Sequence, residues 1–128
     1  MLVAAQILSL IAALIHVYIF LMESLWWERP QTRKVFGTSE QEAKSTSALA
    51  FNQGFYNLFL AIGALVGLAF FIASQPLIAA TLLYTSLGSM AAAAAVLIIS
   101  SPDKASAAVK QGAAPLLGLI ALLLAQAL

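Results

Sequence analysis

Cysteine is absent from the 128-residue sequence, and Asp, Glu, Lys and Arg together make up only 9% of it. Without cysteine the chain has no disulfide, no thiolate metal ligand and no cysteine nucleophile. Soluble domains carry about 25% charged residues, so this chain has too few charges for a surface that faces water. A formal net charge of +1 gives no indication of a nucleic-acid partner, and we expect none. One histidine and 5 acidic residues are too few to predict a metal site or a cofactor.

What the sequence does contain is long apolar runs, since 62% of its residues are hydrophobic. Lipid offers the backbone no hydrogen-bond partner, so an apolar run of about 20 residues predicts a helix that crosses the bilayer. Four such runs occur, at residues 2–25, 49–73, 77–99 and 113–128. We therefore predict one domain, residues 1–128, that is an all-α four-helix transmembrane bundle in a cell membrane.

The fourth run is short for a membrane span. At 1.5 Å per residue, its roughly 16 residues do not cross a hydrocarbon core of about 30 Å. Either the helix also takes in residues 109–112 or the bilayer becomes thinner around it. Pro115 lies near the start of this run, where proline is tolerated in a first helical turn but kinks the helix in any later one.

The basic side chains are divided unequally between the two sides of the predicted bundle. Every Lys and Arg lies in one of two connections, residues 26–48 and 100–112: Arg29, Arg33, Lys34, Lys44, Lys104 and Lys110. In a chain with four spans, these two connections lie on the same side of the membrane. Because cytoplasmic loops of membrane proteins are enriched in Lys and Arg, we expect this side to be cytoplasmic and both termini to lie on the non-cytoplasmic side.

The first connection contains a helix start. Ser39 and Glu42 match the S-x-x-E capping box, in which each side chain accepts a hydrogen bond from the backbone N–H of the other residue. Glu40 and Lys44 follow at i, i+4 spacing, in the order that stabilises a helix. A helix that begins here and continues into the second span forms one rod of about 34 residues, or about 50 Å.

Polar and ionisable side chains within the predicted spans mark the candidate site, because such groups at membrane depth face the bundle interior and pair. The first span carries His16 and Glu23, seven residues apart on one helix stripe. They are separated by roughly 10 Å along the helix axis, so their partners must come from another span or from water. The second span begins with a polar cluster at the predicted depth of Glu23, and we take all six residues as ligand-binding candidates: His16, Glu23, Asn52, Gln53, Tyr56 and Asn57.

The same polar groups can also act only in helix packing, where an interhelical hydrogen bond contributes about 0.6 kcal/mol on average. Gly63 and Gly67 form a G-x-x-x-G pattern, which permits close helix approach. On the third span Thr81, Thr85 and Ser89 recur every four residues and predict a second packing seam. Because four helices with such seams leave little room for an internal cavity, we expect a homo-oligomer, with any ligand in a cleft between subunits.

Three segments carry a resemblance to a known family. They are residues 16–20 (HVYIF) with Glu23, residues 27–30 (WERP) with residues 35–37 (VFG), and residues 52–61 (NQGFYNLFLA). On these segments the sequence resembles, over essentially its whole length, the small bacterial integral membrane proteins of the domain-of-unknown-function 1304 family. The resemblance implies a multi-pass architecture and a location in the bacterial inner membrane, and it implies no reaction.

A more distant resemblance is to the membrane-associated eicosanoid and glutathione metabolism proteins, which are four-span helical proteins that form trimers and bind glutathione between subunits. Their second helix carries an Arg-Ala-x-x-Asn-x-x-Glu pattern. When its asparagine is aligned with Asn52, Ala48 stands at the arginine position and Phe55 at the glutamate position. The resemblance thus implies the architecture, while both ligand-binding charges are absent from this chain.

Three functions from different classes fit these observations. The chain can be a membrane module that binds a lipid or small apolar molecule near the cytoplasmic interface, through the polar cluster and the apolar walls beside it. It can be a structural or accessory subunit whose polar residues serve only helix packing. It can also be a small intramembrane enzyme of the glutathione-transferase-like class, with Glu23 or His16 as acid or base and Tyr56 as a positioning group.

Overall fold

A computed structural model describes residues 1–127 of the chain. Leu128, the last residue of the predicted fourth span, lies outside the described residues. Between residues 1 and 127 the chain contains helices and no β-strand, and four helices are long and apolar enough to cross a membrane. The prediction of an all-α four-helix bundle is therefore confirmed.

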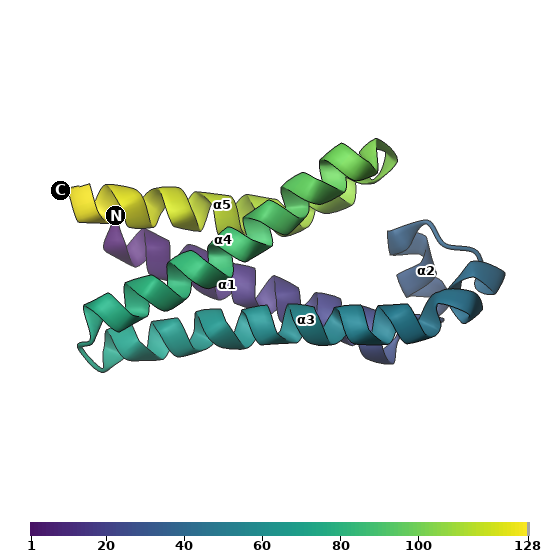
Figure 1. The fold of residues 1–128 in the computed structure, drawn as a ribbon, viewed down its shortest axis with the longest axis horizontal. Helices are drawn as coiled ribbons and strands as arrows, with labels where there is room; N and C mark the ends of the chain where they lie inside the picture. Colours follow the sequence, from purple (N-terminus) through teal and green to yellow (C-terminus); the bar gives the residue numbers. More distant parts are fainter. Residues whose placement is uncertain (128) are drawn as a thin grey trace.

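Short connections separate the helices (Figure 1). In chain order the elements are α1 Leu2–Phe20, its π-helical continuation η1 Leu21–Leu25, α2 Pro30–Phe36, α3 Glu40–Ile72, α4 Pro76–Ser100, the 3₁₀ turn η2 Pro102–Lys104, and α5 Ala105–Ala127. The four apolar helices are α1 with η1, α3, α4, and η2 with α5. The short helix α2 lies within the first predicted connection.

Helix α3 begins in the first connection and runs through the bundle as one helix of 33 residues. Oγ of Ser39 accepts a hydrogen bond from the N–H of Glu42 at 3.1 Å, and the Glu42 carboxylate accepts one from the N–H of Ser39 at 2.9 Å. Nζ of Lys44 lies 3.0 Å from Oε1 of Glu40. The predicted capping box and the continuous rod are both confirmed.

Helix α5 begins well before residue 113, where the fourth apolar run starts. Pro102 opens the turn η2, and α5 follows directly at Ala105, because the alanine-rich sequence up to Gly112 favours a helix. Its 23 residues correspond to about 35 Å, which is enough for a hydrocarbon core of about 30 Å. Pro115 consequently lies inside the helix, and the connection between α4 and α5 is reduced to residues 101–104.

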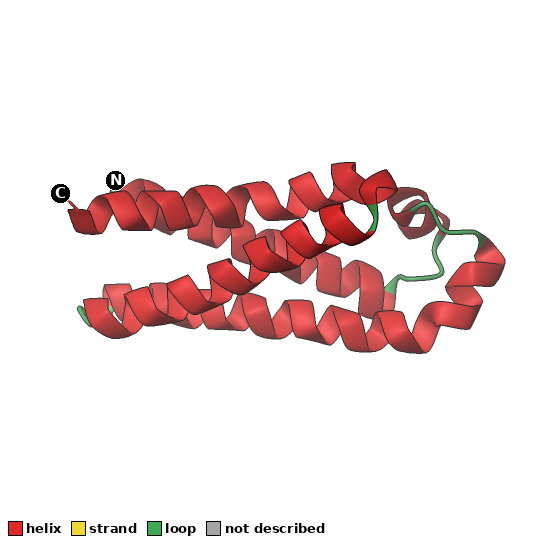
Figure 2. Cartoon of the chain, turned by 45° about the horizontal axis from the view of Figure 1, so that its top comes forward, coloured by secondary structure: helices red, strands yellow, loops and turns green. Residues whose placement is uncertain are grey.

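The four long helices form a ring in which each helix has two neighbours. Helices α1 and α4 each pack against α3 and α5, and they are nearly out of contact with each other. Both termini and the α3–α4 turn lie at one end of the bundle, the terminus end, whereas α2 and the α4–α5 connection lie at the other, the α2 end (Figures 1 and 2). The two polar connections thus share one end, as predicted, and the assignment of that end to the cytoplasm stays a prediction.

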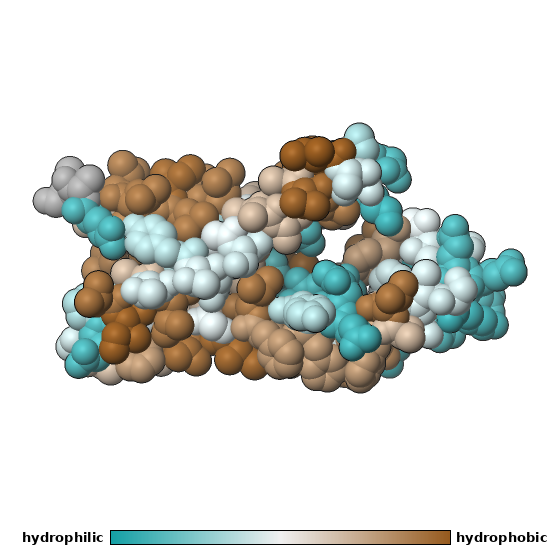
Figure 3. Space-filling view, in the orientation of Figure 1, coloured by the Kyte–Doolittle hydropathy of each residue, from teal (hydrophilic) through white to brown (hydrophobic). Residues whose placement is uncertain are grey.

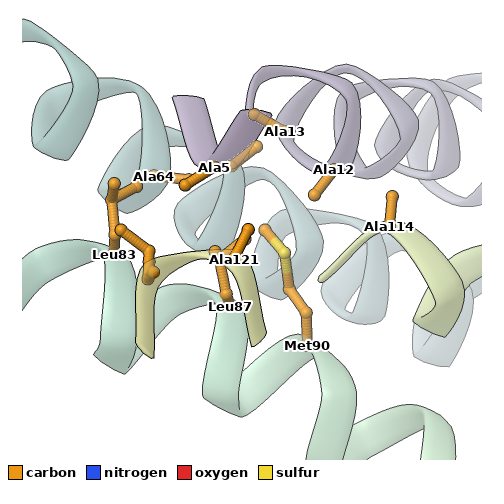
Figure 4. Packing of buried hydrophobic residues seen from close by; sticks show 11 residues of the cluster. Ala5, Ala12, Ala13, Ala64, Leu83, Leu87, Met90, Ala114 and Ala121 are labelled. Carbon is orange, nitrogen blue, oxygen red and sulfur yellow. The ribbon is translucent and has the colours of Figure 1, made fainter. Parts of the chain in front are cut away.

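The core is built mainly from small side chains. On α1 the buried residues Ala5, Ser9, Ala12, His16 and Ile19 alternate steps of four and three, the spacing of a helix that packs along one seam. Two of these alanines join a cluster with residues of the other three long helices (Figure 4), including Ala64, Leu83, Leu87, Met90, Ala114 and Ala121. In lipid, small side chains let helix backbones approach closely, and the resulting van der Waals contacts hold the bundle together.

The predicted G-x-x-x-G seam is confirmed, and its partner is α4. A Cβ atom on Gly63 would contact Oγ of Ser86, so the serine side chain would have to turn away to admit one. A Cβ atom on Gly67 would lie 3.0 Å from Cγ of Leu83. Helices α3 and α4 are therefore packed closely against each other at Gly63 and Gly67.

The seam predicted from the α4 hydroxyls is wrong for contacts within one chain. Thr81, Thr85 and Ser89 are exposed, and each hydroxyl donates a hydrogen bond of 2.8 Å to the carbonyl four residues earlier. Their spacing placed them correctly on one helix face, but the buried face of α4 carries Leu83 and Leu87 instead. The homo-oligomer stays a prediction.

Candidate functional site

The helices separate toward the α2 end and leave a cavity of about 760 Å³. Its lining includes the polar side chains of His16, Glu23 and Asn57 and the apolar side chains of Leu60 and Val96. Figure 3 shows the hollow between α3 and the far end of α4, with hydrophilic surface inside it. The expectation that the bundle has no room for an internal cavity is therefore wrong, because the α1–α3 pair diverges from the α4–α5 pair.

A second cavity of about 830 Å³ adjoins the first, beside η1, α2 and the first half of α3. The two cavities share several lining residues, among them Glu23, Trp27, Phe36, Gln53 and Lys104. The α2 end thus contains two neighbouring cavities, and Glu23 lines both of them.

Glu23 lies in the π-helical segment η1, where α1 changes its hydrogen-bonding pattern. The N–H of Trp26 donates to the carbonyl of Leu21, five residues earlier, at 2.9 Å. Such π-turns are rare and occur frequently at functional sites. Oε2 of Glu23 accepts a hydrogen bond of 2.8 Å from Nδ2 of Asn57 on α3. The predicted meeting of Glu23 with the polar cluster of the second span is confirmed at this pair.

A glycine contact holds α1 and α3 together beside this pair. Oγ of Ser24 donates a hydrogen bond of 2.8 Å to the carbonyl of Phe51. A Cβ atom on Gly54 would contact Oγ of Ser24 and would lie 3.1 Å from Cβ of Glu23. Because glycine leaves this space free, the Glu23 side chain can approach α3 closely enough to reach Asn57.

His16 lines the first cavity from deeper in the bundle and is 2% exposed. Its Nδ1 lies 2.9 Å from the carbonyl oxygen of Ala12, which can only accept, so Nδ1 carries the proton. In the neutral ring Nε2 is then a hydrogen-bond acceptor. The partner of His16 in the described residues is thus a carbonyl of its own helix, whereas the sequence led us to expect a group on another span or water.

The remaining candidates lie around the shared wall of the two cavities. Gln53 lines both cavities, whereas Asn52 and Tyr56 line only the second. Nδ2 of Asn52 donates to the carbonyl of Ala48 on its own helix at 3.3 Å, and Tyr56 is 66% exposed. The six candidates therefore divide into an inner group around Glu23 and Asn57 and an outer pair, Asn52 and Tyr56, at the rim.

The candidate list from the sequence omitted several polar residues that line the first cavity. They come from α2, η2 and α5, and they are Lys34, Asp103, Lys104, Ser106, Lys110 and Gln111. The sequence indicates a role in membrane orientation alone for Lys104 and Lys110. The sequence predicts a connection at residues 100–112, so it does not indicate that Ser106, Lys110 and Gln111 lie on a helix that lines the cavity.

The described residues show a single ion pair within 4.0 Å, between Lys44 and Glu40. Among residues 1–127 no group of three or more His, Asp or Glu side chains is arranged to hold a metal ion. Trp27 lines both cavities. Its Nε1 donates a hydrogen bond of 3.2 Å to Oγ1 of Thr46 on α3. The lining of the site thus combines polar and charged side chains with apolar ones.

The sequence model of a family described as "Protein of unknown function (DUF1304)" matches residues 10–123 of the chain. This match covers the helices that form the cavities. No curated protein and no solved structure matches the chain. The relation to the membrane-associated eicosanoid and glutathione metabolism proteins thus stays a prediction from the sequence.

Proposed function

The chain belongs to the family of proteins of unknown function DUF1304, whose description names no activity, and we propose that it binds a lipid or other small apolar molecule at its α2 end. The proposal rests on one observation. Polar groups of two different helices, Glu23 and Asn57, meet inside a cavity that is large enough for a ligand. Residues that serve only helix packing would fill the space between the helices instead of lining a cavity.

The size and lining of the first cavity support this function. Ligand sites are concave, have volumes of about 300–1,000 Å³, and combine apolar walls with a few convergent polar groups. The first cavity has a volume of about 760 Å³. His16, Glu23 and Asn57 provide its convergent polar groups, and Leu60 and Leu97 belong to its apolar walls.

The place of the cavity in the bundle suits a molecule with one polar and one apolar part. Trp27 lies at the end of the first span, and tryptophan is enriched at membrane–water interfaces. A ligand whose polar part lies near Glu23 can extend its apolar part along Leu60 and Val96, which lie on the facing helices α3 and α4. We therefore favour an amphiphile of the bilayer as the ligand.

Two alanines of α4 provide a matched test. Both Ala93 and Ala95 are exposed, but only Ala93 lines the cavity. Tryptophan at position 93 would occupy the cavity, whereas tryptophan at position 95 would face lipid. We expect the wild type and Ala95→Trp to retain a specific lipid after purification, and Ala93→Trp to lose it, as measured by mass spectrometry of solvent extracts.

Circular dichroism in detergent gives the control for folding of both variants. Equal lipid content in the two folded variants would contradict the proposal. So would a wild-type lipid content that simply reproduces the composition of the surrounding membrane.

A further inference from the structure

Three lysines of the α2 end line the first cavity together. Lys34 belongs to α2, Lys104 to η2 and Lys110 to α5, and all three are exposed. They come from both polar segments of the sequence, so it is the fold that places them around one cavity. An excess of Lys and Arg on one side of a membrane protein is general, but it does not explain why three of them line the same cavity.

Two other basic residues of this end, Lys44 and Arg29, already contact other side chains. Lys44 forms an ion pair with Glu40 at 3.0 Å, and the guanidinium of Arg29 lies 5.1 Å from the centre of the Trp26 ring. Neither Lys44 nor Arg29 lines either of the two cavities described above. The three cavity lysines, by contrast, form no ion pair within 4.0 Å in the described part of the chain.

Two carboxylates also line the first cavity, and neither is paired with a lysine. Glu23 accepts its hydrogen bond from Asn57 and lies on the α1–α3 side of the cavity. Asp103 lies beside Lys104 in the chain, yet it too forms no ion pair within 4.0 Å among residues 1–127. Three ammonium groups therefore face the same cavity with two carboxylates, and the cationic part of the lining belongs to α2, η2 and α5.

This charge distribution deepens the proposed function, on which the inference rests. We propose that Lys34, Lys104 and Lys110 bind the anionic head group, a phosphate or a carboxylate, of an amphiphile held in the first cavity. Ammonium groups bind such oxygens through charge-assisted hydrogen bonds. Ser106 and Gln111 line the same cavity and provide neutral donors for the remaining oxygens.

The test compares three probes on the purified full-length protein in a neutral detergent. Hexadecyl phosphate carries the charge and the chain, hexadecanol carries only the chain, and inorganic phosphate carries only the charge. Native mass spectrometry measures the affinity of each. We expect hexadecyl phosphate to bind at least about tenfold more tightly than hexadecanol, because only the phosphate forms charge-assisted hydrogen bonds. Inorganic phosphate should bind most weakly, since it lacks the apolar contacts.

Matched variants identify the residues that bind the anion. Replacing Lys34, Lys104 and Lys110 together by Gln should lower the affinity for hexadecyl phosphate to that for hexadecanol, whose own affinity should not change. Replacing the same three lysines by Arg keeps the charge and should retain binding, which separates loss of charge from loss of the fold. Arg29→Gln combined with Lys44→Gln removes basic residues outside the cavity and should leave every affinity unchanged.

The possible contrary results distinguish failure of the anion site from failure of amphiphile binding. Equal wild-type affinities for hexadecyl phosphate and hexadecanol, or full binding by the folded Gln variant, would overturn the anion site and leave amphiphile binding intact. Failure of both amphiphiles to bind would overturn the proposed function itself. Lysine-dependent binding of inorganic phosphate as tight as that of hexadecyl phosphate would support the anion site and overturn the role of the apolar chain.

Discussion

The terminus end and the α2 end consist of the same four long helices, yet they pack differently. At the terminus end, buried side chains such as Ala5, Leu83 and Ala121 fill the space between all four helices. At the α2 end, close glycine contacts lie within helix pairs: Gly54 lies against Ser24, and a Cβ on Gly112 would lie 2.6 Å from Cβ of Ala94. Between the pairs, the cavities replace the core.

The two ends differ in the residues that bring the helices into contact. Apolar surface alone does not drive helices together there, because lipid tails are as apolar as the side chains, so small residues and interhelical hydrogen bonds determine where helices meet. The α2 end has such contacts from α1 to α3 and from α4 to α5, but between the pairs it has a cavity whose lining includes charged side chains such as Glu23 and Lys110. The bundle therefore combines a packed half with a half that has room for a ligand.

The largest effect is expected from a cavity created in the packed half. Leu87 is fully buried on α4, whereas Leu116 on α5 is 52% exposed. Leu87→Ala should lower the free energy of unfolding by about 2–3 kcal/mol, because the neighbouring side chains cannot fill the space. Leu116→Ala should change it by less than about 0.5 kcal/mol, as for other exposed positions. Unfolding in mixed detergent, followed by circular dichroism, measures both, and equal losses would show that the terminus end is not packed as described.

A smaller effect is expected from adding volume at a helix contact. Gly67→Val places a side chain against Leu83, whose Cγ would lie 3.0 Å from the new Cβ. This should cost about 1–2 kcal/mol, because a packed interface must move apart. Gly88 provides the control, since no heavy atom lies within 4 Å of a Cβ at that position. If Gly88→Val destabilised the protein as much as Gly67→Val in the same unfolding assay, the contact with Leu83 would not explain the loss at position 67, because valine has a higher helix propensity than glycine.

The smallest effect is expected in the open half, at the hydrogen bond between the helices. Asn57→Ala removes the donor to Glu23 and should cost about 1 kcal/mol, within the range measured for interhelical hydrogen bonds in membranes. Asn52 donates only to Ala48 of its own helix, so Asn52→Ala should have almost no effect on the unfolding free energy. A larger loss for Asn52→Ala than for Asn57→Ala would contradict the described contacts.

The helices could be predicted because their signals are local. Apolar runs gave the four spans, and the pair Ser39 and Glu42 gave the start of α3, since a capping box needs only residues three apart. The start of α5 was harder to predict. The segment around Lys110 is polar enough to resemble a connection, although its many alanines favour a helix.

The candidate site could be predicted only in part, because its cavity depends on how helix pairs diverge. Burial at membrane depth identified Glu23 and the polar cluster of α3, and the hydrogen bond from Asn57 joins them. No local pattern indicates that α4 separates from α3, so nothing in the sequence places Lys34 and Lys110 around the same cavity as Glu23. The same limit explains why the exposed hydroxyls of α4, such as Thr85, were expected in a buried seam.

The proposed function depends on an open cavity between the two helix pairs at the α2 end. Because the chain has no cysteine, Ala93→Cys and Ala95→Cys each introduce a single thiol at nearly the same depth on α4. Reaction of each purified variant with a charged thiol reagent, in neutral detergent after bound lipid has been removed, tests the claim most directly, since thiols react as thiolates in water. We predict rapid labelling of Ala93→Cys, which faces the cavity, and no labelling of Ala95→Cys, which faces lipid. Equal labelling of the two, or protection of both, would contradict the cavity and the ligand site proposed in it.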